Sequence, residues 1–426
     1  MNLEPKMPPG ESARPRPAWL AWLCAPTGTA IFALGITQII AWGTTLYALG
    51  VLGGPIAADT GWSRSLVFAG LTVGLLTSGI FSTTIGKAID RHGGRLIMSV
   101  GSLLCAAALA IVAIATHPVV YLAGWIVMGL GMRMSLYDAA FAALVQVTPQ
   151  HGRRAISYLT LFGGFASTVF WPVGHVITGA YGWRTTLLVY AAINLLIALP
   201  LHWWGLARRE EVRTASTATT SVTSIPDTPL EGQARTLAMV LFAIVMSASA
   251  FVFGAMSVHL PAVLEASGLS VAAAVTLASL KGVAQVGGRL AEILFGRRLH
   301  AVDLGRISVG GIPLGFAILL LGGANFTAAF LFIVFFGIAN GLVTIVRGAA
   351  PLALFGSKGY GAILGILATP YLILNAIAPA VFAVVVDLWG YGAAETVMLV
   401  AGLIATVAME IMAIWYRRRI KSAPAP

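Results

Sequence analysis

Charged residues are scarce in this sequence. Asp, Glu, Lys and Arg together make up 10% of its 426 residues, whereas hydrophobic residues make up 58%, and the mean hydropathy is +0.90. A water-soluble globule of this composition would expose far more apolar surface than its polar residues could cover. The shortage of charge therefore excludes a soluble globular domain and predicts a polytopic membrane protein.

Cysteine and the motifs of catalysis are also nearly absent. Cys24 and Cys105 are the only cysteines, and both fall in or beside apolar segments, so we expect two free thiols rather than a disulfide framework. No phosphate-binding loop ending in Gly-Lys-Ser/Thr, no metal-ligand spacing and no nucleophile constellation occurs. We expect no enzyme activity, no cofactor and no metal, and we expect any transport to use solute or ion gradients.

What the sequence does contain is a series of apolar segments of about 20 residues, the length that crosses a hydrocarbon core of about 30 Å. They lack the alternating polarity of membrane β-strands. We therefore predict an all-α membrane protein with twelve transmembrane helices. The expected spans are residues 28–52, 66–85, 96–115, 119–147, 155–180, 185–205, 236–260, 271–295, 307–322, 327–350, 361–386 and 394–416.

A polar segment divides these spans into two sets of six. Pro172 before Gly182 in the first half is mirrored by Pro379 before Gly390 in the second half, which indicates two pseudo-symmetric bundles related by a parallel repeat. The expected organisation is an N-terminal tail, a six-helix bundle, a flexible Ser/Thr-rich linker, a second bundle and a C-terminal tail. Their boundaries are residues 1–27, 28–205, 206–235, 236–416 and 417–426.

The placement of Lys and Arg predicts the topology. Basic residues lie almost entirely in alternate loops, and the opposite loops contain only Arg64 and Arg184. By the positive-inside rule, both termini face the cytoplasm, and we expect the bacterial inner membrane as the location. The basic residues that give the net charge of +11 are thus expected in loops at the membrane surface, and no nucleic-acid partner is expected. The first apolar run lacks a convincing cleavage site and is expected to be retained.

The segment from Gly86 to Arg95 identifies a family. It has a leading Gly86, the pair Asp90-Arg91, then Gly93 and Arg95, in the loop between the second and third spans. This resembles the signature hinge of the major facilitator superfamily. The resemblance implies two bundles that rock around a central site, a chain that works as a monomer, and a hinge whose Asp contacts a helix terminus.

Further motifs resemble one subfamily, the monocarboxylate and oxalate/formate porters. In the eighth span those porters tend to carry an Asp and an Arg four residues apart, whereas this chain has Gln285 and Arg289. Because an amide does not titrate, Gln285 cannot take a proton-coupling role. The motifs that carry the resemblance are Gly61-Trp62-Ser63-Arg64-Ser65, Gly129-Leu130-Gly131, Gly152-Arg153-Arg154-Ala155 and Gly182-Trp183-Arg184.

Cations within the spans predict the cargo. Each would cost about 2.5 to 3.5 kcal/mol at the centre of a lipid-facing helix, so we expect these side chains to face protein or water. Central carboxylates are limited to Asp138, and the resulting positive cavity would attract an anion. Arg289 is the best candidate to grip a carboxylate; an ion pair with Glu292 is its structural alternative. The candidate substrate-binding residues are Arg289, Arg347, Lys281, Arg133, Tyr47, Gln285, Tyr371 and Asn375.

A second set of residues could couple transport to protons or control the opening between the bundles: Asp138, Arg347, His175 and His259. Asp138 and Arg347 occupy nearly equivalent places in the two repeats, so we hypothesise a charge pair between the bundles that breaks and reforms during transport. The alternative is a static pair of Asp138 with Arg133 or Arg347. Asp138 is also the leading protonatable group, and His175 and His259 could titrate near neutral pH or be structural.

These observations predict a secondary transporter that moves a small organic anion, first of all a monocarboxylate, as a symporter with protons or as an antiporter exchanging anions. Two alternatives remain open: efflux of a drug-like or toxic compound, and a transporter-like receptor that binds solute without moving it.

Overall fold

The computed structural model describes residues 25–209, 229–296 and 299–422. Helices make up almost all of this part of the chain, and it contains no strand. Most of the expected N-terminal tail, the centre of the linker and Cys24 lie outside the described residues. Cys105 is a buried free thiol, as expected.

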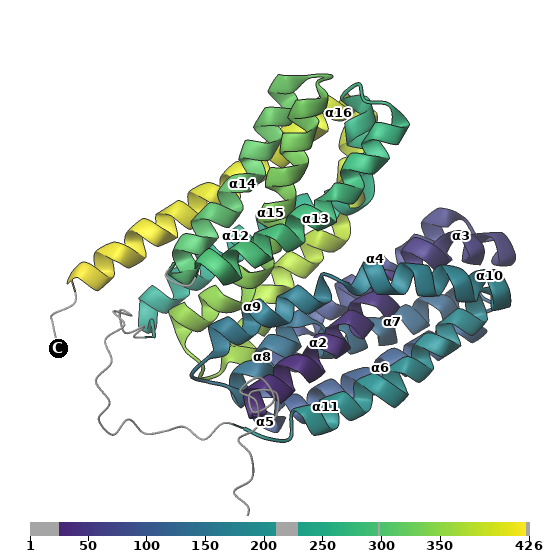
Figure 1. Ribbon diagram of the computed structural model, residues 1–426, viewed down its shortest axis with the longest axis horizontal. Coiled ribbons are helices and arrows are strands. Elements are labelled where there is room, and N and C mark those ends of the chain that lie inside the picture. Colours follow the sequence, from purple (N-terminus) through teal and green to yellow (C-terminus); the bar gives the residue numbers. More distant parts are fainter. Residues whose placement is uncertain (1–24, 210–228, 297–298, 423–426) are drawn as a thin grey trace, which may run out of the picture.

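The helices of the first half form one lobe, called here the N-lobe (residues 25–209). Figure 1 shows it as the purple-to-teal part of the ribbon. Its helices are α2 (Pro26–Thr44), α3 (Ala48–Thr60), α4 (Arg64–Ile80), α5 (Ser82–His92), α6 (Gly94–Ile114), α7 (Pro118–Ser135), α8 (Tyr137–Val147), α9 (Gly152–Gly163), α10 (Ala166–Ile193), η1 (Asn194–Ala198) and α11 (Leu199–Gly205).

The second half forms the C-lobe (residues 229–296 and 299–422). It has fewer and longer helices, and α16 is helical to Ser422, so the expected C-terminal tail begins as a continuation of the last helix. The helices are α12 (Gly232–Ala266), α13 (Val271–Phe295), α14 (Ala301–Gly322), α15 (Phe326–Phe355) and α16 (Tyr360–Ser422).

Ten helical stretches of the described chain are long and apolar enough to cross a membrane when the pair α4 and α5, bent by 55°, counts as one. Two of these stretches each contain a break. Gly182 has φ 81° and ψ 165°, and Gly390 has φ 79° and ψ 173°. Each break divides its stretch into two spans, which accounts for the twelve expected. The matching backbone angles also support the repeat inferred from sequence.

Several details differ from the sequence prediction. The spans expected at residues 66–85 and 155–180 are interrupted at Phe81 and at residues 164–165. The span expected at residues 28–52 is interrupted between α2 and α3, and the span expected at 119–147 is interrupted at Leu136. The helix expected from residue 307 begins at Ala301, because Asp303 and Arg306 at its start find ionic partners. The break at Leu136 matters most, since it places Asp138 in the first turn of α8, where helix N–H groups favour a negative charge.

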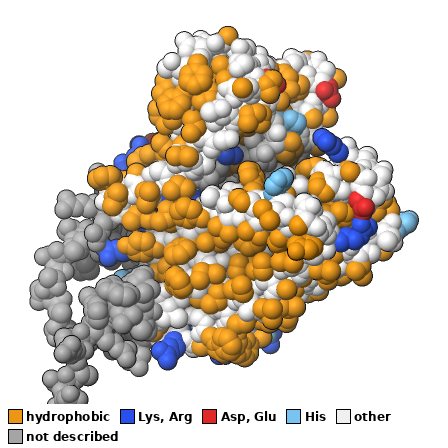
Figure 2. Space-filling view, turned by 45° about the vertical axis from the view of Figure 1, so that its right-hand side comes forward, with side chains coloured by type: hydrophobic (Ala, Val, Ile, Leu, Met, Phe, Trp, Pro, Cys, Tyr) orange, Lys and Arg blue, Asp and Glu red, His pale blue; other side chains and the backbone are white. Residues whose placement is uncertain are grey.

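The two lobes meet at one end, called here the joined end, and separate toward the other, the open end. Tyr360 and Leu364 of α16 belong to an N-lobe core cluster, and α16 packs on α4 and α5 while α9 packs on α13 and α15. By contrast, α3 and α10 pack mainly on other helices of the N-lobe, and they lie at the open end (Figure 1). Figure 2 shows a hollow between the lobes with Lys, Arg and His side chains visible around it.

Candidate functional site

The centre of the interface between the lobes is organised around Asp138. Its Oδ2 accepts a hydrogen bond from the Tyr371 hydroxyl at 2.5 Å and lies 3.6 Å from Nη1 of Arg133. Its Oδ1 lies 3.2 Å from Nε of Arg347. Because Tyr371 and Arg347 belong to the C-lobe, one N-lobe carboxylate ties both lobes together.

The two arginines beside Asp138 have different surroundings. The Arg133 side chain is 3% exposed, and its Nε donates to Ser82 Oγ at 2.7 Å. The Arg347 side chain is 19% exposed, and its guanidinium carbon lies 5.7 Å from the Tyr137 ring centroid and 5.3 Å from that of Tyr371. Such cation–π contacts stabilise a partly desolvated charge. Arg347 is therefore the more exposed arginine of this pair.

Arg289 of α13 also bridges the lobes, although it is only 2% exposed. Its Nη1 donates to the Thr160 carbonyl of the N-lobe at 2.8 Å, and two weaker contacts at 3.5 Å join Nε to the Gly341 carbonyl and Nη2 to the Thr344 hydroxyl. These acceptors are all neutral. Within the described residues, no carboxylate lies within 4.0 Å of this guanidinium, so its charge is solvated by dipoles but not neutralised.

The alternative pairing of Arg289 with Glu292 is wrong. Glu292 lies 3.8 Å from Arg153 of the N-lobe instead, and Arg153 also donates to the Gly296 carbonyl at 3.4 Å. Three residues of separation place Arg289 and Glu292 near one another on α13, but each side chain finds a partner on the opposite lobe. Arg153 adds a contact at the joined end that the sequence did not indicate.

Lys281 and Gln285 lie on the same face of α13 as Arg289, since the three residues are four apart along one helix. The Lys281 ammonium lies 5.7 Å from the Phe336 ring centroid, and no carboxylate in the described part of the chain pairs with it. Both side chains are half-buried. This face of α13 therefore presents two cations and an amide in a row.

The remaining candidates divide between the two lobes. Tyr47 is half-buried between aromatic rings of the N-lobe. Asn375 donates to the Ala250 carbonyl at 3.0 Å and ties α16 to α12. The His259 ring contacts the Pro379 carbonyl at 3.0 Å and stacks on Phe382, and His175 is exposed on α10. The structure does not bring either histidine to Asp138.

The hinge segment makes the contact that the family resemblance implies. Both carboxylate oxygens of Asp90 accept backbone hydrogen bonds at the start of α16, from Gly361 at 2.9 Å and Ala362 at 2.7 Å. Gly86 is required beside them, because a Cβ there would collide with the Gly361 carbonyl.

The other hinge residues act locally. Gly93 has φ 84°, which favours glycine, and Arg95 lies over the Trp203 ring at 4.1 Å. Arg91 is exposed. Among the motif residues, Gly86 and Asp90 of α5 thus approach the C-lobe backbone directly.

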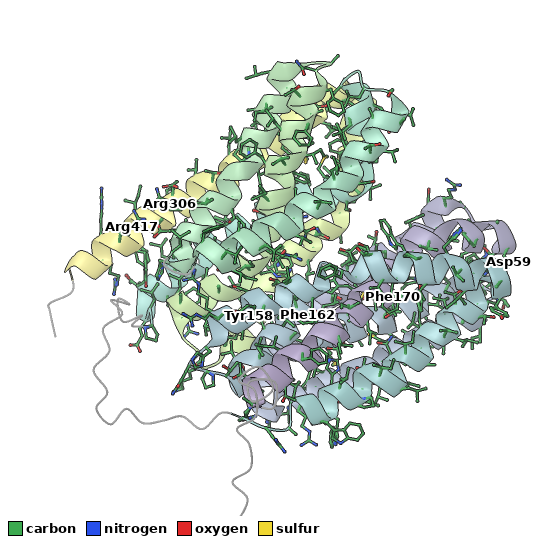
Figure 3. All side chains as sticks on the ribbon, in the orientation of Figure 1. Asp59, Tyr158, Phe162, Phe170, Arg306 and Arg417 are labelled. Atoms are coloured by element: carbon green, nitrogen blue, oxygen red, sulfur yellow. The ribbon has the colours of Figure 1, made fainter. Side chains whose placement is uncertain are left out.

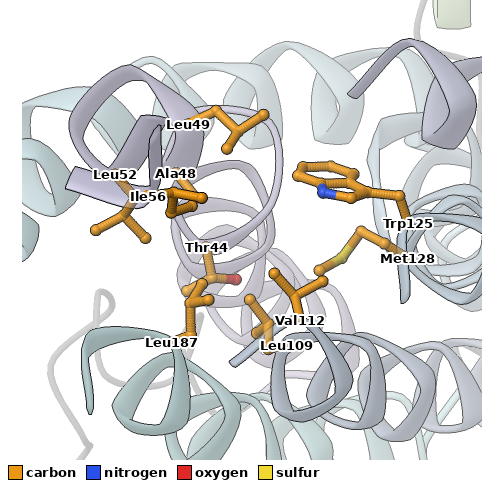
Figure 4. Close-up of a pocket in the computed structure, with 10 residues that line it drawn as sticks. All are labelled: Thr44, Ala48, Leu49, Leu52, Ile56, Leu109, Val112, Trp125, Met128 and Leu187. Atoms are coloured by element: carbon orange, nitrogen blue, oxygen red, sulfur yellow. The ribbon is translucent and has the colours of Figure 1, made fainter. Parts of the chain in front are cut away.

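One enclosed void lies within the N-lobe rather than between the lobes (Figure 4). Its volume is about 10 Å³, and its lining is apolar except for Thr44. The Thr44 hydroxyl already donates to the Ile40 carbonyl and accepts from Asn194. A space of this size could hold at most one water molecule, so it is excluded as a solute site.

Peripheral ion pairs mark the two ends of the molecule. Asp59 pairs with Arg184 at the open end, and Arg417 pairs with Asp303 near the C-terminal end of α16 (Figure 3). Arg306 bridges to Glu410 at 2.7 Å in the same cluster. These pairs are partly exposed, so they contribute little to stability, and they lie far from the central cations.

Comparison with known proteins gives the class. The sequence model of the Major Facilitator Superfamily matches residues 31–315, which is more than half of the chain, so this chain belongs to the major facilitator superfamily. It is therefore a membrane transporter with the major facilitator fold, rather than an enzyme.

Solved structures of similar fold include two transporters. The human organic anion transporter MFSD10 (TETRAN) superimposes with a TM-score of 0.70 at 14% identity, covering 90% of this chain and 99% of that one. The proton:xylose symporter XylE, bound to 6-bromo-6-deoxy-D-glucose, gives a TM-score of 0.66 at 14% identity, covering 92% of this chain and 96% of that one. At this identity the likeness shows the fold alone. A comparison with curated proteins found no match, so the subfamily stays a prediction.

Proposed function

We propose that this transporter moves a small organic anion, with monocarboxylates as the leading candidates, by alternating access between its two lobes. The observation that carries the proposal is Arg289, whose charge is buried between the lobes and contacts only neutral oxygens among the described residues. Leaving a buried charge without a counter-ion is costly. A carboxylate that enters from the hollow would supply the missing negative charge through two parallel hydrogen bonds.

The charge balance of the interface supports an anion over a cation. Arg133, Arg289 and Arg347 lie at the centre of the contact between the lobes with Asp138 as their one carboxylate, and Lys281 lies about two turns from Arg289 on the same face of α13. The further inter-lobe pair of Arg153 and Glu292 adds no net charge. A low-dielectric cleft strengthens the positive potential that such an excess creates. A cationic drug would be repelled from this site. The human structural neighbour is described as an organic anion transporter, so the fold is compatible with such cargo.

Alternating access requires the joined end to open. With the orientation predicted from the Lys and Arg distribution, the joined end faces the cytoplasm and the hollow faces outward. Release to the other side then requires that Asp90 leave the start of α16 and that Arg153 leave Glu292. We propose that occupation of the site by an anion lowers the cost of this transition, because the cations no longer repel one another.

Asp138 is the proposed coupling group. Protonation would remove its attraction for Arg347 and Arg133 and would loosen the link between the lobes. Gln285 cannot share this role because it does not titrate. In a proton symporter, Asp138 would take up a proton together with the binding of the substrate carboxylate. In an anion exchanger, Asp138 would stay ionised throughout the transport cycle.

Flux through the full-length protein in proteoliposomes tests the proposal. Radiolabelled acetate and pyruvate should accumulate when an inward proton gradient or an internal anion is supplied. Arg289→Gln should abolish most of this flux and Arg289→Lys should retain part of it, because Lys keeps the charge but loses the bidentate grip. Arg154→Gln, on an exposed position of α9, is the matched control and should transport normally.

Three results would separate the alternatives. Flux of neutral or cationic compounds without flux of carboxylates would replace the anion assignment with drug efflux. Saturable carboxylate binding without flux would indicate a receptor. Carboxylate flux that responds to an internal anion but not to a proton gradient would assign exchange rather than symport.

A further inference from the structure

A row of aromatic side chains in the N-lobe begins at the central cations. The Tyr137 ring lies 5.7 Å from the guanidinium carbon of Arg347, and its hydroxyl donates to the Thr160 carbonyl, the same oxygen that accepts from Arg289. The Trp42 ring follows at 5.2 Å from Tyr137, and Tyr47 follows at 6.0 Å from Trp42. These centroid distances fall within the range of favourable ring–ring contacts.

The row becomes more exposed as it leaves the cations. Tyr137 is 3% exposed, Tyr47 is half-buried, and Trp171, whose centroid lies 6.3 Å from Tyr47, is 50% exposed. Trp171 belongs to α10, which makes its substantial contacts within the N-lobe. The four rings thus extend from the buried charges to a surface that the C-lobe does not cover.

Trp42 supplies a second, independent observation. Its indole Nε1 is buried and has no hydrogen-bond acceptor among the described residues. A buried donor without a partner carries a desolvation cost and is uncommon in native structures. This donor lies in the middle of the row, between Tyr137 and Tyr47. It is covered in this conformation, so an oxygen substituent on a ligand would accept its hydrogen bond only once the neighbouring rings move.

From this geometry we infer that the cargo is an aromatic carboxylate, whose carboxylate meets Arg347 and Arg289 and whose ring lies against Trp42, Tyr47 and Trp171. The inference rests on the proposed anion transport and narrows its substrate class. Arg347 meets the carboxylate first, since it is the more exposed of the two arginines. A small aliphatic acid would occupy the cationic end alone and leave the aromatic row uncovered.

Calorimetric titration of the full-length protein in nanodiscs with three acids tests this inference. Benzoate and cyclohexanecarboxylate share a charge and a similar size but differ in aromaticity, and acetate lacks a ring. Benzoate is expected to bind about three- to tenfold more tightly than cyclohexanecarboxylate, the range of ring-specific contacts, and acetate should bind most weakly. Trp171→Leu should reduce the preference for benzoate without changing acetate binding, because it removes one of the three rings that the ligand contacts.

Trp204→Leu is the matched control, because Trp204 is 70% exposed on α11 and lies outside the row; this variant should keep the preference. Tyr47→Leu provides a second test should Trp171→Leu fail to fold. Equal binding of benzoate and cyclohexanecarboxylate, or an unchanged preference in both row variants, would overturn the aromatic assignment and leave anion transport standing. Absence of binding by all three acids would overturn the monocarboxylate assignment itself, and this inference with it.

Discussion

Asp138 of α8 and Arg347 of α15 form an ion pair across the boundary between the lobes, with 3.2 Å between Oδ1 and Nε. The Tyr371 hydroxyl, from the same lobe as Arg347, donates to the other carboxylate oxygen. Any motion that separates the lobes at this depth must break both contacts. The pair therefore contributes both to the stability of this conformation and to the barrier for leaving it.

This relationship predicts non-additive effects on stability. Asp138→Asn leaves Arg133 and Arg347 without their carboxylate and should lower the free energy of unfolding by about 3 to 5 kcal/mol. Arg347→Gln should cost less, because Asp138 keeps Arg133. The double variant should cost about 1 to 3 kcal/mol less than the sum of the single variants. Unfolding in detergent measures all three, and strict additivity would show that the two side chains do not interact.

Asp90 should control the joined end. Asp90→Asn retains one acceptor oxygen but turns an amide donor toward a backbone N–H at the start of α16. The expected loss is about 1 to 2 kcal/mol, and the joined end should open more often. Hydrogen–deuterium exchange in α5 and in the first turn of α16 should rise. Asp387→Asn, at an exposed position of α16, is the control; equal exchange in both variants would contradict the assignment.

Gly86 should tolerate no side chain. Gly86→Ala places a methyl group against the Gly361 carbonyl, so α5 and α16 must separate, at an expected cost of about 1 to 3 kcal/mol in this conformation. Gly54→Ala is matched, because nothing lies within 4 Å of a Cβ at that position in α3. Measured unfolding free energies should fall for the first variant and stay nearly unchanged for the second. A tolerated Gly86→Ala would show that the helices approach less closely.

Gly390 should be required for its backbone conformation alone. It has φ 79°, and a Cβ there would meet nothing within 4 Å. Gly390→Ala should therefore cost about 1 to 2 kcal/mol through left-handed strain. Gly392→Ala, two residues along the same helix and also without neighbours, should be neutral or slightly stabilising. Thermal unfolding of the pair in one detergent compares them directly, and equal stabilities would argue against strain at Gly390.

Much of the fold follows from the sequence because lipid imposes strong rules. Spans could be predicted from apolar length alone, and the repeat from the matching positions of Gly182 and Gly390. The break at Leu136 could not be predicted, since residues 118–147 as a whole are apolar enough for one span despite Arg133 and Asp138, and hydropathy does not record where a helix changes direction.

The candidate site was predicted in part. Asp138 and Arg347 are candidates because charged groups within spans are rare, Tyr371 is a further candidate, and the three lie together in the structure. The Thr160 carbonyl that receives Arg289 was not predicted. Every residue of α9 has a backbone carbonyl, so the sequence does not show which of these carbonyls accepts the hydrogen bond from Arg289.

The sequence by itself determined that this chain is embedded in a membrane and belongs among the major facilitator transporters, because transfer into lipid depends on composition and the hinge motif is local. Only the tertiary structure decided which charges cancel. Glu292 pairs with Arg153 rather than with Arg289, and Asp138 meets Arg347 from the other lobe. Coulombic attraction depends on distance, and helices far apart in sequence fix these distances only when they pack.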